Sequence, residues 1–120
     1  MLVVDDYRTM RRILRNLLAE IGFVNVEEAE DGRSALRMLH ERRYDLVISD
    51  WNMTPMSGLD LLRLVRWDDE LKHVPFIMIT AVNTAENVAA AKAEGVSGYI
   101  VKPFTAATLQ KRIDSVLGPR

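Results

Sequence analysis

The feature that most constrains the fold is a short apolar run that stops abruptly at a carboxylate. Residues 46–48 (Leu-Val-Ile) are followed by Ser49 and Asp50, and a loop containing Pro55 and Gly58 comes next. An apolar run of this length, bounded by turn residues, is typical of a strand buried on both faces of a parallel sheet. Asp50 is therefore predicted at the carboxyl end of a buried strand, where open α/β sheets bind their ligands.

Similar runs recur along the chain and alternate with stretches of helical periodicity. The predicted strands are residues 2–4, 24–26, 46–48, 76–79 and 99–101. The first predicted helix carries Met10, Ile13, Leu14, Leu17, Leu18 and Ile21 on one stripe and ends at Gly22. The others run from residue 32 to about 43, from the N-cap Ser57 onward, over 85–93 before Gly95, and from Thr105 to Gly118-Pro119.

Five strands that alternate with five helices predict a parallel sheet covered by helices on both faces. Right-handed crossovers leave few topologies open. We predict the flavodoxin-like (βα)5 fold, a doubly wound parallel sheet with strand order 2-1-3-4-5. The switch point of this order lies between the first and third strands. These are the two strands that run into carboxylates, since residues 2–4 lead directly into Asp5 and Asp6.

Composition sets the outer bounds on function. The 120 residues are predicted to form one domain, residues 1–120. The net charge of −1 shows no excess of basic residues of the kind that binds nucleic acid or an anionic membrane. The chain has no cysteine, which excludes disulfides and thiolate metal sites. No apolar run approaches the roughly 20 residues needed to span a bilayer, and no secretory leader precedes the first strand. We expect a cytoplasmic protein.

Three carboxylates are predicted to meet at the switch point: Asp5, Asp6 and Asp50. Like charges this close repel one another, so either one carboxylate holds a proton or a cation neutralises the group. Oxygen ligands without Cys or His select magnesium or a similar divalent ion. Such a site suits phosphoryl transfer, in which a carboxylate can be the nucleophile and form an aspartyl phosphate.

Two later strands end in groups that fit the same chemistry. Thr80 follows residues 76–79 with a hydroxyl, and Lys102 follows residues 99–101 with an ammonium. Both strand ends point to the edge that carries Asp50, where they could contact phosphoryl oxygens. Pro103 restricts the Lys102 backbone, and a cis bond there is one way to turn the lysine into the site. Any one of these residues alone is more often a turn or cap residue, so the prediction depends on their coincidence.

The same motifs resemble those of the two-component response regulator receiver domain, over essentially the whole chain. They are Val3-Val4-Asp5-Asp6, Ile48-Ser49-Asp50-Trp51-Asn52-Met53, Ile79-Thr80-Ala81 and Tyr99-Ile100-Val101-Lys102-Pro103-Phe104. The likeness is greatest to the single-domain chemotaxis members. Further blocks carry it: Thr9-Met10-Arg11-Arg12-Ile13, Arg15-Asn16-Leu17-Leu18, Glu27-Glu28-Ala29-Glu30-Asp31-Gly32 and Phe104-Thr105-Ala106-Ala107-Thr108-Leu109. The predicted strand order is also that of this family, so it is not independent of the resemblance.

The resemblance implies a phosphoacceptor and a magnesium site. Asp50 would accept the phosphoryl group, and the chain would be a signalling switch rather than an enzyme, limited to self-phosphorylation from a phosphodonor and slow autodephosphorylation. Asp6 would bind Mg²⁺ directly and Asp5 mainly through water. Asp50 itself and the backbone carbonyl of Asn52 would complete the protein ligands.

The resemblance also implies a switch and partners. Lys102 would contact the phosphoryl group, Thr80 would swing toward it, and Tyr99 would move inward as Thr80 vacates space. These movements would change the face formed by the fourth helix, fifth strand and fifth helix. The implied partners are a chemotaxis-type histidine kinase, a flagellar motor switch protein or other target, and a phosphatase. We expect a monomer with no direct binding of nucleic acid or membrane.

Some positions depart from the family pattern. Proline stands at Pro55, one position later than usual, with Thr54 in its place. Val82 replaces the glutamate of the best-known enteric chemotaxis member, so we expect a different dephosphorylation rate. Three positions that are lysines on that member's motor-binding face differ here: Thr84, Ala85 and Ser115. Three others keep the apolar character of the face: Val88, Tyr99 and Val101.

Four alternative interpretations remain. The chain could be the receiver domain of another two-component pathway, or part of a longer regulator. A haloacid-dehalogenase-like phosphatase would need a second carboxylate two residues after the nucleophile, where this chain has Asn52. A flavodoxin-like electron carrier would need a hydroxyl- and glycine-rich loop after the first strand, where Asp5 and Asp6 would repel the flavin phosphate.

Other polar residues receive structural assignments. The isolated histidines His40 and His73 show no ligand-like spacing and are predicted to be solvated. Arg11, Arg12 and Arg15 are assigned to the exposed side of the first helix, as a solvated face or a surface on which a kinase docks.

Overall fold

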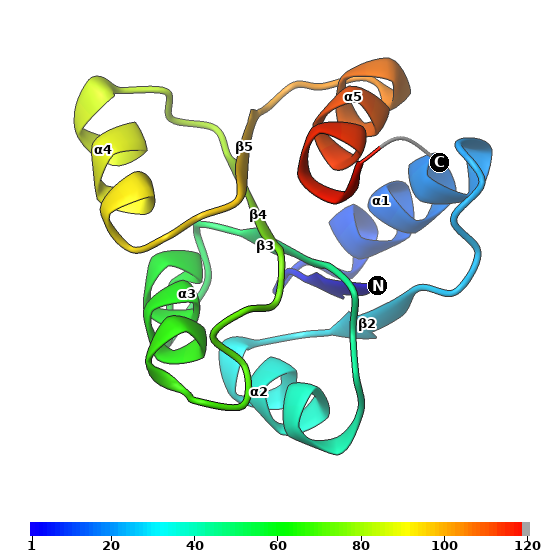
Figure 1. The fold of residues 1–120 in the computed structure, drawn as a ribbon. Helices are drawn as coiled ribbons and strands as arrows, with labels where there is room; N and C mark the ends of the chain where they lie inside the picture. The colour runs from blue at the N-terminus through cyan, green and yellow to red at the C-terminus, as the bar shows by residue number, and fades with distance from the viewer. Residues whose placement is uncertain (119–120) are drawn as a thin grey trace.

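The computed structural model describes residues 1–118, in which five strands alternate with five helices (Figure 1). In chain order they are β1 (Leu2–Val4), α1 (Arg8–Glu20), β2 (Glu27–Ala29), α2 (Gly32–Glu41), β3 (Val47–Asp50), α3 (Gly58–Trp67), β4 (Phe76–Thr80), α4 (Ala85–Ala93), β5 (Gly98–Val101) and α5 (Ala106–Leu117). Gly118 follows α5 as its C-cap, and Pro119, the second residue of the predicted stop signal, lies outside the described residues.

The strands form one parallel sheet in the order β2-β1-β3-β4-β5, which confirms the predicted topology. Helices cover both faces: α1 and α5 lie on one side of the sheet, and α2, α3 and α4 lie on the other (Figure 1). None of the helices in the described part of the chain is both long and apolar enough to cross a membrane.

The alternation of side chains along each strand divides the core into two clusters, one on each face of the sheet. Leu2 and Val4 of β1 pack into the cluster under α2 and α3, while Val3 between them packs into the cluster under α1 and α5. Strand β4 divides in the same way, and all five of its residues are buried. Burial on both faces explains why the inner strands are near-continuous apolar runs.

The prediction of the second strand was wrong. It was assigned to residues 24–26, but β2 is Glu27–Ala29, and Val24 is exposed. Pairing with β1 sets the position, because Leu2 aligns with Glu27 and Val4 with Ala29. Because β2 lies at the edge of the sheet, its charged side chains can bind groups outside the core. Apolar content therefore did not predict the position of this strand.

The predicted stripe of the first helix was too wide. Leu14 and Leu18 are buried as expected, but Ile13 is 44% exposed. Ile13 precedes Leu14 by one residue, which is about 100° around a helix of 3.6 residues per turn. Within the described residues, the helix packs mainly against α5 and β1, so the apolar surface that it buries is narrower than its apolar stripe in the sequence.

Polar residues that precede four helices cap them, as side-chain oxygens accept hydrogen bonds from first-turn amides. They are Asp31, Ser57, Thr84 and Thr105. Ser57 confirms the predicted start of α3 and forms a reciprocal capping box with Asp60. Helix α4 buries fewer residues than the other described helices, since Ala91 is its one buried residue.

Gly58 at the start of α3 lies against the backbone of β3. Its amide donates to the carbonyl of Trp51 at 2.8 Å. A Cβ at this position would collide with the carbonyl oxygen of Asp50 and lie 2.9 Å from the Trp51 Cα. Main-chain atoms cannot move aside without displacing the strand end.

We therefore predict that Gly58→Ala lowers the free energy of unfolding by about 1–3 kcal/mol, the usual cost of overpacking. Gly32→Ala is the matched control, because Gly32 also opens a helix and is buried, but its Cβ would meet the flexible side chain of Met56. That variant should stay within about 1 kcal/mol of the parent protein. Urea denaturation measures both, and equal losses would contradict the assignment.

Candidate functional site

The ends of β1 and β3 bring three carboxylates together. Val4 aligns with Ser49 in the parallel register, so Asp5 and Asp50 follow at the same edge of the sheet. Carboxylate oxygens of Asp5, Asp6 and Asp50 all lie within 4.8 Å of one another. Asp5 and Asp50 are 1% and 5% exposed, whereas Asp6 is exposed. The predicted convergence of these side chains is therefore present.

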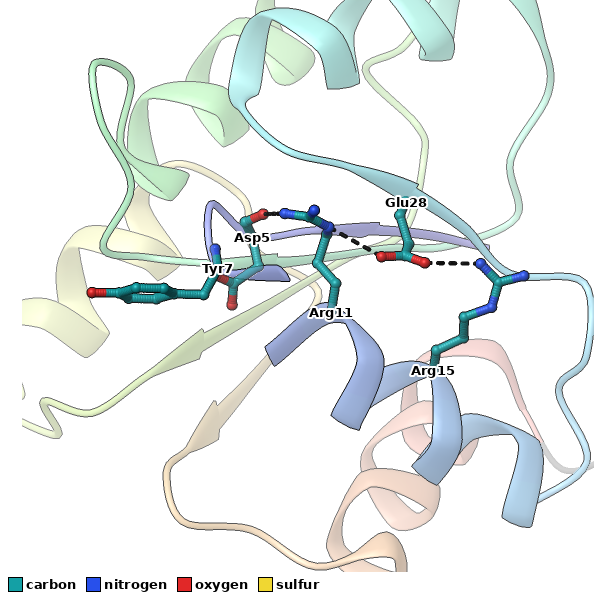
Figure 2. Close-up of polar contacts among 5 residues, drawn as sticks. All are labelled: Asp5, Tyr7, Arg11, Arg15 and Glu28. Atoms are coloured by element: carbon teal, nitrogen blue, oxygen red, sulfur yellow. Dashed lines mark hydrogen bonds and ion pairs between the residues drawn. The ribbon is translucent and has the colours of Figure 1, made fainter. Parts of the chain in front are cut away.

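Main-chain and side-chain groups hold Asp5 on several sides. Its Oδ1 accepts from the amide of Tyr7 at 2.9 Å, and its carbonyl oxygen accepts from Nη1 of Arg11 at 2.6 Å (Figure 2). Burial is the main cause that raises the pKa of Asp5, to about 6, and the charges of Asp50 and Asp6 add to it. The Tyr7 amide and the Lys102 ammonium act in the opposite direction.

Lys102 extends from the end of β5 to the acidic group. Its Nζ lies 2.9 Å from Oδ1 of Asp50, and its amide donates to the carbonyl of Thr80. The peptide bond between Lys102 and Pro103 is cis, as is the bond before Pro55. The ammonium partly offsets the charge that two buried carboxylates and one exposed carboxylate concentrate here.

Thr80, Val82 and Tyr99 form a short hydrogen-bonded series beside the acidic group. The buried Thr80 hydroxyl oxygen accepts from the Val82 amide at 3.1 Å. The Tyr99 hydroxyl donates to the Val82 carbonyl at 3.0 Å. The Tyr99 ring meets that of Trp51 edge to face, with centroids 6.4 Å apart. Thr80 therefore binds the amide of Val82, and Tyr99 binds the carbonyl oxygen of the same residue.

A surface groove of about 410 Å³ lies next to this series, where α4, β5 and α5 meet. Val88, Tyr99 and Val101 give it apolar walls, and Lys92 and Arg112 give it positive charge. The sequence predicted an apolar face at these elements. The groove adds a shape that the sequence alone does not provide.

The donor set fits a hard divalent cation. Asp5, Asp6 and Asp50 offer carboxylate oxygens only, and Mg²⁺ binds such ligands while keeping several waters. Asn52 is exposed in the loop directly after β3. The ligand role of its backbone carbonyl stays a prediction.

Sequence reasoning missed a polar connection between α1 and β2. Nε of Arg11 lies 3.0 Å from Oε1 of Glu28, and Nη1 of Arg15 lies 2.9 Å from Oε2 of the same side chain (Figure 2). The assignment of Arg11 to the exposed side of the helix was therefore wrong, while Arg12 and Arg15 are exposed as expected. The one available signal was the spacing of Arg11 and Arg15, which places both on one face of a helix.

Comparisons with known proteins agree with this geometry. The model of the response regulator receiver domain family matches residues 1–114. Chemotaxis protein CheY-3 of Vibrio cholerae is 54% identical over 115 residues, covering 96% of this chain and 88% of that protein. Chemotaxis protein CheY of Pseudomonas aeruginosa is 50% identical over the same length, covering 96% of this chain and 93% of its own.

Solved structures show the same fold. The structure of Vibrio cholerae chemotaxis protein CheY4 at low pH has a TM-score of 0.89 and 37% identity, covering 96% of this chain and 95% of that one. The receiver domain of a sensor histidine kinase from Pseudomonas aeruginosa has a TM-score of 0.87 and 26% identity, covering 98% of this chain and 96% of that one. That structure is described with a magnesium ion coordinated in its active site cleft.

The raised pKa of Asp5 predicts how the stability of the metal-free protein depends on pH. Between pH 3.8, the ordinary pKa of the carboxyl, and about 6, the folded state holds a proton that the unfolded state has released. The free energy of unfolding should therefore fall as pH rises through this interval and level off above it.

Urea denaturation in EDTA, on the parent protein and on Asp5→Asn, isolates the contribution of this one carboxyl. The difference in unfolding free energy between parent and variant should decline from pH 4 to about 6, because the amide does not titrate. Parallel pH profiles for the two proteins would mean that Asp5 is not the group responsible.

Proposed function

Because the chain belongs to the family of response regulator receiver domains, we propose that it is a phosphoacceptor switch of the chemotaxis type. In this proposal a histidine kinase supplies the phosphoryl group, Asp50 accepts it, and a changed surface then binds a target. The observation that carries the proposal is the convergence of Asp5, Asp6 and Asp50, with Lys102 at 2.9 Å from the acceptor carboxylate.

Asp50 is suited to act as the nucleophile. An oxygen of its carboxylate would attack the phosphorus of a phosphohistidine, forming an O–P bond as the N–P bond breaks and the imidazole leaves. Nζ of Lys102 lies 2.9 Å from Oδ1 of Asp50, so its ammonium is placed to pair with an incoming phosphoryl oxygen. Burial of Asp50 limits access of water to the acyl phosphate that results.

Asp5, Asp6 and Asp50 would hold Mg²⁺, with the Asn52 carbonyl as a further ligand. The ion would supply positive charge against the phosphoryl oxygens during transfer. The relative that is described with a magnesium ion in its cleft supports this choice of metal. Asp5 contributes its carboxylate in a fixed orientation, since the Tyr7 amide binds Oδ1.

The hydrogen bonds of Val82 offer a route from the phosphoryl group to the surface. If the Thr80 hydroxyl turns to a phosphoryl oxygen, the Val82 amide loses its acceptor. The Val82 carbonyl accepts the hydrogen bond of the Tyr99 hydroxyl. Movement of Val82 would therefore also release that hydroxyl. Tyr99 lines the groove between α4, β5 and α5, and its inward movement would change the groove's shape.

We propose that this groove binds the output target, a flagellar motor switch protein. The names of the chemotaxis relatives support this choice of pathway. Lys92 and Arg112 at the groove would favour a partner with acidic residues around apolar ones. We further propose that residues 1–120 form one receiver domain, and that the protein acts in the cytoplasm as a monomer with a chemotaxis kinase and a phosphatase.

The test of the acceptor is Trp51 fluorescence, titrated first with Mg²⁺ and then with acetyl phosphate. Trp51 directly follows Asp50 and should report both events. We expect the parent protein to respond to each addition, and Asp50→Asn to lose the response to acetyl phosphate. Asp69→Asn, which removes an exposed carboxylate, is the control that should behave as the parent does. A full acetyl phosphate response in Asp50→Asn would exclude Asp50 as the acceptor.

Val82→Glu should change the lifetime of the phosphorylated protein. Val82 is 42% exposed, and its main chain is hydrogen-bonded to Thr80 and Tyr99. A carboxylate at this position would lie beside the path by which water reaches the acyl phosphate. The decay of ³²P-labelled protein after removal of the donor measures the half-life. Asn83→Glu places the same charge one residue away and should leave the half-life nearer that of the parent. Identical half-lives for parent and Val82→Glu would refute the prediction.

A further inference from the structure

We propose that Arg11 is a positioning residue for the metal site, which it serves by joining β2 to the main chain of Asp5. The proposal rests on the function proposed above, because it concerns the ability of the acidic group to bind Mg²⁺. Arg11 touches neither the phosphoryl group nor the metal in this proposal. Its action is on the peptide that carries two of the metal-binding side chains.

The guanidinium of Arg11 contacts two acceptors at once. Nε lies 3.0 Å from Oε1 of Glu28, and Nη1 donates to the carbonyl oxygen of Asp5 at 2.6 Å (Figure 2). The side chain of Arg11 is only 13% exposed, so both contacts are partly shielded from water. A planar guanidinium with donors in fixed directions holds two such acceptors in a defined relative position.

Glu28, the carboxylate that binds Arg11, is itself held in position. It lies in the middle of β2, where it pairs in register with Val3 of β1. Arg15 binds the second oxygen of its carboxylate, and the hydrogen bonds from both arginines help to hold the pKa of Glu28 below its ordinary value. A carboxylate that stays ionised and is bound on both oxygens keeps its orientation, and so does the arginine that bridges from it.

The peptide between Asp5 and Asp6 is where the bridge acts. The Asp5 amide donates to Ala29 at 3.2 Å, which continues the pairing of β1 with β2 one residue beyond the end of β1. The Asp5 carbonyl then turns to Arg11. In residues 1–118 no hydrogen bond or ion pair holds the Asp6 side chain, so the position of its carboxylate depends on this backbone. Fixing the peptide therefore places the carboxylates of Asp5 and Asp6 together.

Arg15 is a natural control for Arg11. It lies one turn further along α1 and binds the same glutamate, but it is 50% exposed and makes no contact with Asp5 in the described structure. Removal of either arginine takes away one positive charge and one partner of Glu28. Only removal of Arg11 frees the Asp5 carbonyl.

The experiment compares the Mg²⁺ dissociation constants of the parent, Arg11→Met and Arg15→Met, by Trp51 fluorescence in the absence of phosphodonor. Methionine keeps much of the apolar stem and removes all donors. Partners that orient metal ligands typically contribute 10–100-fold in metal affinity. We expect Arg11→Met to weaken Mg²⁺ binding about tenfold and Arg15→Met to change it less than twofold. Thermal unfolding in EDTA confirms that each variant is folded at the titration temperature.

Arg11→Lys is a second variant that keeps the charge if Arg11→Met does not fold. An ammonium lacks the fixed fork, so we expect at least a threefold weaker affinity than in the parent. Parent-like affinity in Arg11→Met or Arg11→Lys, or equal losses in Arg11→Met and Arg15→Met, would overturn the bridge and leave the proposed function intact. Failure of the parent itself to bind Mg²⁺ would instead overturn the proposed function, and the role of Arg11 with it.

Discussion

Mutual repulsion among carboxylates at one edge of the sheet is the constraint on which the functional part of this structure depends. Asp5 and Asp50 are buried beside each other, with Asp6 within reach, and this concentration of charge is unfavourable unless something opposes it. Lys102 and the Tyr7 amide oppose part of it. The remainder leaves the site with a preference for a proton or a cation, which is the property that a metal-dependent phosphoacceptor requires.

The parallel strands of the sheet explain how these charged groups come to lie at one site. Their carboxyl ends share one edge, so groups far apart in the chain meet there. Asp5 and Asp6 directly follow β1, and Asp50 ends β3. Thr80 ends β4 and Lys102 directly follows β5, at the same edge. The inner strands are held on both faces by apolar packing, which gives the polar edge a stiff support.

The sequence predicted the features that follow from local pattern. Buried strands read as apolar runs, Ser57 marked a helix start, and carboxylates at strand ends indicated where a ligand would bind. It did not predict β2, because the position of an edge strand is set by pairing with its neighbour and not by its own apolar content. Nor did it predict the bridge from Arg11 to Glu28, which joins residues 17 positions apart and depends on the packing of α1 against the sheet.

The shallow anchoring of α4 has a further consequence for how such a domain diversifies. Ala91 is its one buried residue in the described chain, so this helix contributes little apolar area to the interior compared with its neighbours. Mutations at exposed positions of this helix that do not cap it, such as Ala85 and Ala89, therefore cost little free energy of folding. If the groove beside this helix binds the target as proposed, natural selection can change recognition there while the acidic residues stay unaltered, so one scaffold can be adapted to many signalling circuits.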